Sequence, residues 1–145
     1  MKNRPGLKQY IFAALGVVIL VLLDQYTKLL AIAHLKDQSA FVLWNNVFEL
    51  HYLENRGAAF GIFQNQRWFF VIMTVVILVI VSWFYGRTPV EKRYLPLRTC
   101  MIVLTAGAIG NFIDRLTRGY VVDFFYFSLI DFPIFNVADI YVTVT

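Results

Sequence analysis

Apolar residues form long blocks along this chain, and charged residues mark where the blocks end. The longest charge-free block covers residues 68–86, between Arg67 and Arg87. It meets the criterion of about 18 apolar residues for a membrane-spanning helix. Two shorter blocks each end at an aspartate, so they span a bilayer only if an acid is tolerated at the boundary. The blocks predict three membrane helices, at about residues 9–34, 68–86 and 97–114.

A fourth apolar pattern begins at Phe132, is interrupted by Asp139 and stops with the chain at Thr145. At 1.5 Å per residue, a helix over this stretch is about 21 Å long, which is shorter than the hydrocarbon core of a bilayer. We therefore expect a fourth helix over 132–145 that the end of the chain truncates. The prediction for the whole sequence is a single all-α membrane domain, residues 1–145, with four transmembrane helices.

Composition and charge support a membrane protein and orient it. Hydrophobic residues make up 59% of the 145 residues, more than such a short chain can bury in its own interior. Seven basic residues lie in the segments 1–8 and 87–98, whereas five are spread over the longer segments 36–67 and 114–131. The positive-inside rule therefore makes the N-terminus and residues 87–98 cytoplasmic. The net charge of +4 reflects topology and attraction to anionic lipid, not a nucleic-acid surface.

The outward segment 36–67 has the pattern of a small sheet. Aromatic and β-branched runs at 41–44 and 47–53 are separated by Asn45-Asn46, which is a turn signal. A third strand-like run covers residues 120–127. Together these runs predict a small outward-facing β-cradle on the membrane surface.

The first apolar block has an alternative interpretation as a secretory signal that is removed, because basic residues precede it and Ala31-Ile32-Ala33 follows it. The hydrophobic part of a signal is normally shorter than this block, and Asp24 and Lys28 would be unusual within it. A retained helix accommodates both residues, because positions four apart share a face and can pair. The sequence favours the retained helix.

Several common catalytic arrangements are absent from the sequence. No serine lies in a G-x-S-x-G motif, His34 and His51 do not form H-E-x-x-H, and there is no glycine-rich phosphate loop. The single Cys100 excludes an intrachain disulfide and a multi-cysteine metal site. What remains is the chemistry of acids and amides.

Four aspartates lie in or beside the predicted membrane helices: Asp24, Asp114, Asp123 and Asp139. A charge at this depth costs several kcal/mol unless it is paired, so each is a candidate functional residue. Asp24 can pair with Lys28, and a structural ion pair is favoured over a catalytic role. Asp114 has Asn111 and Arg115 nearby on the same helix. We interpret these three residues as a polar clamp that is structural or binds substrate.

Asp123 and Asp139 have no basic residue beside them in the sequence. Two such carboxylates brought together would share a proton and titrate as a coupled pair. An aspartic peptidase uses such a pair, because the ionised partner takes a proton from water while the protonated partner hydrogen-bonds the scissile carbonyl. A small transporter or proton-relay subunit also needs acids in the membrane, and it is the alternative. A non-catalytic anchor protein, the third interpretation, would leave Asn136 and Asp139 without a role.

Five motifs along the chain resemble those of lipoprotein signal peptidase, also called signal peptidase II. They occur in the family's order over nearly the whole sequence, and together they are specific although each alone is weak. The motifs are Asp24-Gln25-Tyr26-Thr27-Lys28, Asn55-Arg56-Gly57-Ala58-Ala59-Phe60, Gly107-Ala108-Ile109-Gly110-Asn111-Phe112-Ile113-Asp114-Arg115, Val121-Val122-Asp123-Phe124 and Phe135-Asn136-Val137-Ala138-Asp139.

The resemblance implies a bacterial multi-pass enzyme of the cytoplasmic (inner) membrane, with its active site facing outward. Such an enzyme is an aspartic endopeptidase that cuts a lipid-modified prolipoprotein just before the diacylglyceryl-cysteine. It needs no metal or cofactor, acts among membrane lipids and is the target of the antibiotic globomycin. The family's catalytic aspartates correspond to Asp123 and Asp139. Its supporting or substrate-binding residues correspond to Asp24, Lys28, Asn55, Arg56, Gly57, Asn111, Asp114, Arg115 and Asn136.

Overall fold

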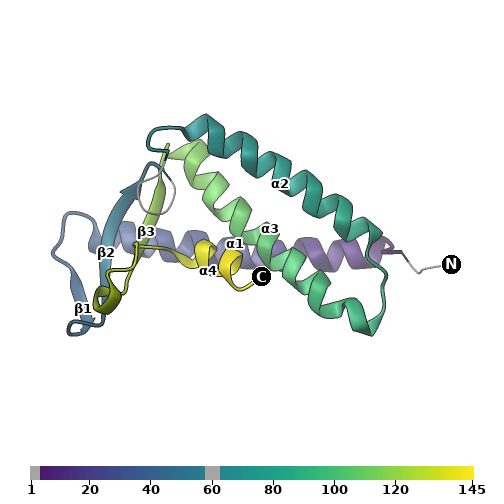
Figure 1. Ribbon diagram of the computed structural model, residues 1–145, viewed down its shortest axis with the longest axis horizontal. Coiled ribbons are helices and arrows are strands. Elements are labelled where there is room, and N and C mark those ends of the chain that lie inside the picture. The colour runs from purple at the N-terminus through teal and green to yellow at the C-terminus, as the bar shows by residue number, and fades with distance from the viewer. Residues whose placement is uncertain (1–3, 58–62) are drawn as a thin grey trace.

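The computed structural model describes residues 4–57 and 63–145, which form long helices with a small sheet at one end (Figure 1). In chain order the helices and strands are α1 (Leu7–Leu35), β1 (Phe41–Trp44), β2 (Phe48–Asn55), α2 (Arg67–Arg87), α3 (Leu95–Thr117), β3 (Val121–Tyr126) and α4 (Val137–Thr143). Short 3₁₀ turns precede α3 and follow β3, at η2 (Lys92–Tyr94) and η3 (Ser128–Ile130).

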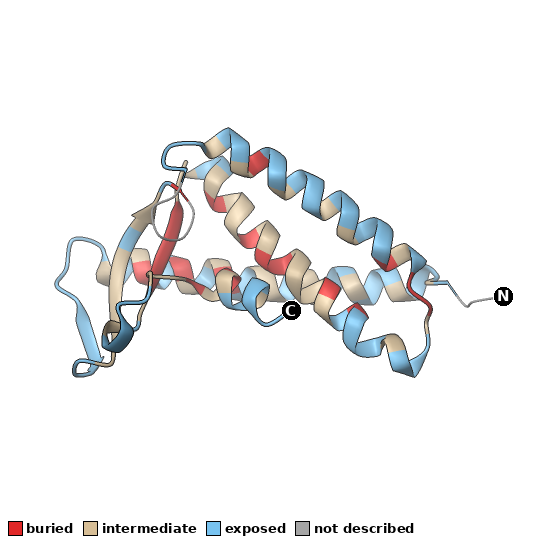
Figure 2. Ribbon diagram, viewed as in Figure 1, coloured by how far each residue is buried: buried red, intermediate tan, exposed pale blue. Residues whose placement is uncertain are grey.

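Within residues 4–57 and 63–145, three helical segments are long and apolar enough to cross a membrane, namely α1, α2 and η2 together with α3. Long apolar helices therefore occur where the sequence predicted the three membrane spans. The buried residues of α1 are Asp24, Lys28 and Ala31, whereas its large apolar side chains are mostly exposed (Figure 2). This arrangement reverses that of a water-soluble helix and fits a helix whose apolar side chains face lipid.

The sheet has the order β1-β2-β3, with both pairs antiparallel. All three predicted strand-like runs therefore form strands. Ala31 at the end of α1 packs against Val122 and Phe124 of β3, which joins the sheet to the helices. The sheet lies at the opposite end of the molecule from the start of α1 and the α2–α3 connection (Figure 1). The start of α1 and residues 87–98, which the distribution of basic residues assigned to the same side of the membrane, therefore lie at the same end of the molecule.

The fourth helix is shorter than predicted. The start predicted at Phe132 is wrong, because α4 begins only at Val137 and ends at Thr143. Phe135 instead pairs with Phe125 of β3 through hydrogen bonds of 2.8 and 3.0 Å, so the chain before the helix is extended. Asn136 is the N-cap, and its side chain accepts the backbone N–H of Asp139. This pairing with β3 is what carries Asp139 toward Asp123.

One basic residue that the sequence assigned to the cytoplasmic connection lies inside the bundle. Arg98 is 6% exposed and donates to the Tyr85 hydroxyl at 2.6 Å and to the Thr88 carbonyl at 3.3 Å. The Tyr85 hydroxyl in turn donates to the Gln9 carbonyl at 3.1 Å. These bonds tie α1, α2 and α3 together at the end far from the sheet.

Candidate active site

A cavity of about 490 Å³ opens between the sheet, α3 and α4. Asp123 reaches it from β3 and Asp139 from α4, so the fold brings the two predicted catalytic residues to one space. Its polar lining also includes Asn55, Asn111 and Arg115. Apolar side chains complete the wall, among them Val121, Phe132, Pro133, Ile134, Phe135, Ile140, Val142 and Val144. The cavity therefore offers carboxylates beside an apolar surface.

Asp123 is buried, with 1% of its surface exposed. Asn136 donates to its Oδ1 at 2.6 Å, and Asn55 donates to its Oδ2 at 2.9 Å. The Asn55 amide is itself oriented, because its Oδ1 accepts the N–H of Gly57 at 2.9 Å. Burial and the nearby charge of Asp139 raise the pKa of the Asp123 carboxyl to about 7, although the two asparagine hydrogen bonds oppose this change. Asp123 therefore keeps its proton nearer to neutral pH than an ordinary aspartate does.

Asp139 lies in the first turn of α4 and is bound to the N-cap. Its N–H donates to Asn136 Oδ1 at 3.0 Å, and the Asn136 N–H donates to Asp139 Oδ2 at 3.1 Å, which forms a capping box. The other carboxylate oxygen accepts the Asn111 amide at 2.8 Å. Asn136 thus contacts both aspartates. Among the ion pairs of the described residues, none includes Asp123 or Asp139.

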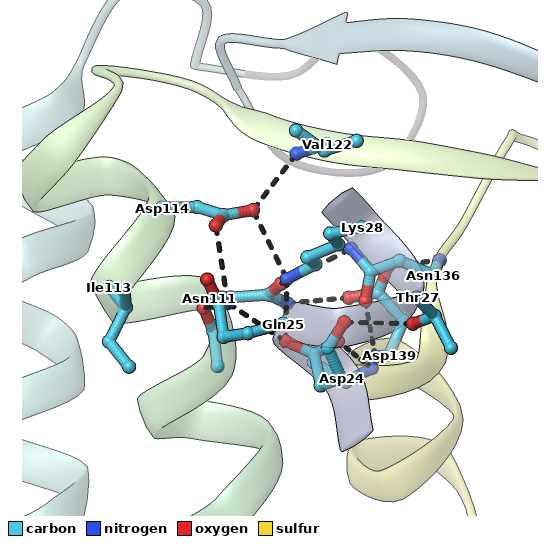
Figure 3. A network of polar contacts seen from close by, with 12 residues as sticks. Asp24, Gln25, Thr27, Lys28, Asn111, Ile113, Asp114, Val122, Asn136 and Asp139 are labelled. Carbon is cyan, nitrogen blue, oxygen red and sulfur yellow. Dashed lines mark hydrogen bonds and ion pairs between the residues drawn. The ribbon is translucent and has the colours of Figure 1, made fainter. Parts of the chain in front are cut away.

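A buried ion cluster lies beside these aspartates, between α1 and α3 (Figure 3). Lys28 pairs with Asp24 at 3.0 Å and with Asp114 at 3.2 Å, and none of the three side chains is exposed. The predicted pair of Asp24 and Lys28 is thereby confirmed. Arg118 supplies a second cation to Asp114, so two positive charges balance two negative ones. Buried charges are tolerated when they are paired and hydrogen-bonded in this way.

Asn111 and Arg115 lie four residues apart on α3, and both line the cavity. Arg115 donates to the Gly57 carbonyl at 3.3 Å, and its guanidinium lies 4.6 Å from the centre of the Phe70 ring. The predicted clamp of Asn111, Asp114 and Arg115 is not a single unit, because Asp114 pairs with Lys28 and Arg118 while the other two residues line the cavity. Consecutive helical residues point about 100° apart, which turns Asp114 away from the cavity that Arg115 faces.

Arg56 is a predicted site residue that the structure does not bring to the cavity. Its side chain is 53% exposed, lies 3.4 Å from the Glu54 carboxylate and stacks against Tyr120. Gly57, the next residue, does line the cavity. The rest of that motif, residues 58–60, lies outside the described residues.

The sequence prediction missed three residues of the ion cluster. Gln25 donates to Asp24 at 3.1 Å, to the Gly110 carbonyl at 3.1 Å and to Asp114 at 3.3 Å. Arg118 follows Asp114 by four residues, a spacing that could have indicated the pair. A Cβ atom at Gly110 would lie 2.5 Å from Asp24 Oδ2, so only glycine leaves room for this carboxylate.

A comparison with known protein families identifies the family to which this chain belongs. The family model described as Signal peptidase (SPase) II matches residues 16–145, which include both cavity aspartates and the ion cluster. The chain belongs to the signal peptidase II family. The family that the five motifs predicted is therefore confirmed, and with it a protease.

Relatives and solved structures agree with membership of the signal peptidase II family. The lipoprotein signal peptidase of Lactococcus lactis is 41% identical over 128 residues, which cover 88% of this chain and 83% of the relative. That of Streptococcus thermophilus is 44% identical over 133 residues, which cover 90% of this chain and 86% of the relative. A bacterial membrane enzyme solved by the in meso method at 2.3 Å has a TM-score of 0.79 and 34% identity, covering 99% of this chain and 86% of its own. A second such structure, at 1.9 Å, has a TM-score of 0.79, 33% identity and coverages of 99% and 91%.

Proposed function

We propose that this chain is an aspartic endopeptidase that removes signal peptides from diacylglyceryl-modified prolipoproteins, with Asp123 and Asp139 as its catalytic dyad. The observation that carries the proposal is the meeting of these carboxylates at one cavity, where amide donors hold each of them and no described residue forms an ion pair with either. The relatives are lipoprotein signal peptidases, which supports the substrate class. The cut is proposed to fall just before the lipid-modified cysteine.

The environments of the two carboxylates assign their roles. Because the pKa of Asp123 is raised to about 7, Asp123 enters the reaction protonated and hydrogen-bonds the scissile carbonyl. In this proposal Asp139 is the base, which takes a proton from the attacking water. The water oxygen bonds to the carbonyl carbon, and the Asp123 proton passes to the carbonyl oxygen. When the C–N bond breaks, the leaving amine receives the proton held by Asp139. One hydroxyl group of the tetrahedral intermediate returns its proton to Asp123 as the carbonyl re-forms, which restores both aspartates to their starting states. No metal or cofactor takes part in this proposal.

The position of the cavity suits a lipid-modified substrate. Its wall carries Ile140 and Val142 of α4, and Val144 directly after that helix, which we propose as the fourth membrane helix. The acyl chains can remain in the bilayer while the cysteine reaches the carboxylates. We place the N-terminus in the cytoplasm and the sheet on the outer side of the bacterial cytoplasmic membrane, in agreement with the distribution of basic residues. Globomycin is the expected inhibitor.

Cleavage of a lipidated prolipoprotein by the purified protein tests this function. Asp123→Asn and Asp139→Asn should each lower turnover by at least about 100-fold, since each removes an acid or base from the reaction. Asp37→Asn is the matched control, because Asp37 is exposed and its backbone, with φ of 59°, accommodates asparagine. Turnover close to that of the unaltered protein in either dyad variant would exclude that residue from catalysis.

A further inference from the structure

Lys28 is a buried lysine whose three hydrogen-bond donors all have acceptors. An ammonium group has three N–H donors, and Lys28 Nζ lies 3.0 Å from Asp24, 3.2 Å from Asp114 and 2.9 Å from the side-chain Oδ1 of Asn111. Figure 3 shows it among these side chains of α1 and α3. A single atom therefore holds one side chain of α1 and two side chains of α3.

The ion pair of Lys28 with Asp114 leads to the backbone beside Asp123, the first dyad residue. Asp114 Oδ2, the oxygen that faces Lys28, also accepts the backbone N–H of Val122 at 3.1 Å (Figure 3). Val122 directly precedes Asp123 in β3. The Asp114 carboxylate therefore holds the backbone of β3 one residue before the catalytic side chain.

The ion pair of Lys28 with Asp24 leads in the same way to the backbone beside Asp139, the second dyad residue. Asp24 Oδ2 faces Lys28, and Asp24 Oδ1 accepts the backbone N–H of Ala138 at 2.9 Å. Ala138 directly precedes Asp139 in α4. The hydrogen bond of Lys28 with Asn111 leads to Asp139 itself, because the Asn111 amide that Lys28 orients donates to Asp139 Oδ1 at 2.8 Å.

We propose that Lys28 is a positioning residue that sets the separation of the two catalytic carboxylates. Lys28 bridges the carboxylates of Asp114 and Asp24, which bind the backbone N–H groups directly before Asp123 and Asp139. It also orients the Asn111 amide that donates to Asp139. This role rests on the proposed aspartic mechanism, and it goes beyond balancing charge. If charge balance were the only requirement, any buried cation at this position would serve.

Arg118 provides the contrast that separates the two roles. It also pairs with Asp114, yet its side chain is 22% exposed and its other polar contact is with Gln25 at 3.5 Å. It carries the same charge as Lys28 but does not bridge the Asp24 and Asp114 carboxylates. Arg118→Gln thus removes one positive charge from the cluster and leaves the bridge in place.

The decisive variant is Lys28→Arg, which keeps the charge and changes the geometry. A planar guanidinium cannot direct three donors from one atom toward three acceptors around it. We expect kcat to fall by about 10- to 100-fold while KM stays within about twofold, because a displacement of about 1 Å is costly in catalysis and Lys28 lies outside the cavity wall. We also expect the alkaline limb of the pH profile to move to lower pH, since separation of the carboxylates weakens the effect of Asp139 on Asp123.

Three comparisons make the test conclusive. Arg118→Gln should keep kcat within about threefold, with an unshifted profile. If Lys28→Arg does not fold, the charge-balanced double variant Lys28→Met/Asp114→Asn takes its place, with the same expected loss of kcat at constant KM. A folded Lys28→Arg protein with kcat and profile unchanged, or an equal loss in Arg118→Gln, overturns the positioning role. Activity retained in the dyad variants would instead overturn the proposed mechanism itself.

Discussion

The close packing of α3 against Asp24 and α4 makes Gly110→Ala the most informative single substitution. The added Cβ atom would lie 2.5 Å from Asp24 Oδ2, 3.0 Å from Asp24 Cγ and 3.2 Å from the Ala138 Cβ atom. Ordinary carbon contacts are about 3.5–4 Å, so either Asp24 or α4 must move by about 1 Å. Asp24 is fully buried and bound to Lys28, and it therefore cannot turn away at low cost.

The expected destabilisation is that of an overpacked core, about 1–3 kcal/mol. Gly16→Ala is the matched control, because its Cβ atom would lie 3.3 Å from Ile102 Cγ2, the end of a side chain that can shift. Both glycines lie inside long helices, so both substitutions gain the same helix propensity of about 1 kcal/mol. The difference between the two variants therefore reports the local clash alone.

Thermal unfolding in detergent and cleavage of a lipidated prolipoprotein measure the effect. We expect Tm of Gly110→Ala to lie about 3–10 °C below that of Gly16→Ala. Its kcat should fall by about 100-fold, because displacement of Ala138 moves Asp139. A Gly110→Ala protein as stable and as active as the Gly16→Ala control would refute the reasoning that Asp24 holds α4 against α3.

Three further predictions concern the site and the topology. The proposed mechanism needs a protonated Asp123, whose pKa is about 7, so kcat/KM should decline as pH rises through about 7. Asn55→Ala removes a hydrogen bond that favours the ionised form of Asp123, and measured pH profiles of this variant should show the decline at higher pH. Arg115→Lys should raise KM in steady-state kinetics while turnover at saturating substrate persists, the result of lost uniform binding; a loss of kcat alone would contradict this. In a Cys100→Ser background, cysteines placed near position 46 should react with an impermeant thiol reagent in intact cells, and those near position 90 should not; the reverse would place the dyad in the cytoplasm.

Most of the architecture could be predicted from local pattern. Three membrane helices followed from apolar blocks, and the three strands followed from aromatic and β-branched runs. These elements are readable because each depends on neighbouring residues only. The fourth helix was predicted to start five residues early, at Phe132, because an apolar pattern alone does not distinguish a buried helix from an extended segment. Pairing of Phe135 with Phe125 decided the outcome, and such pairing is not visible in local sequence.

In the candidate site, too, the sequence predicted contacts within one helix but not contacts between helices. The pairing of Asp24 with Lys28 could be predicted, because a spacing of four fixes a shared helical face. The actual partners of Asp114 could not all be predicted, since Lys28 lies on another helix and approaches only when α1 packs against α3. The contact of Gln25 with Gly110 likewise joins residues far apart in the sequence.

The sequence by itself determined which residue types are available, which segments can cross a membrane and, through its five motifs, the family. The tertiary structure decided which acids share a cavity and which are neutralised by buried cations. Among the described residues, Lys28 and Arg118 form ion pairs with Asp24 and Asp114, whereas Asp123 and Asp139 form none. The physical reason is that an electrostatic environment depends on distance and burial, and both are set by the packing of α1, α3 and α4 and not by the order of residues along the chain.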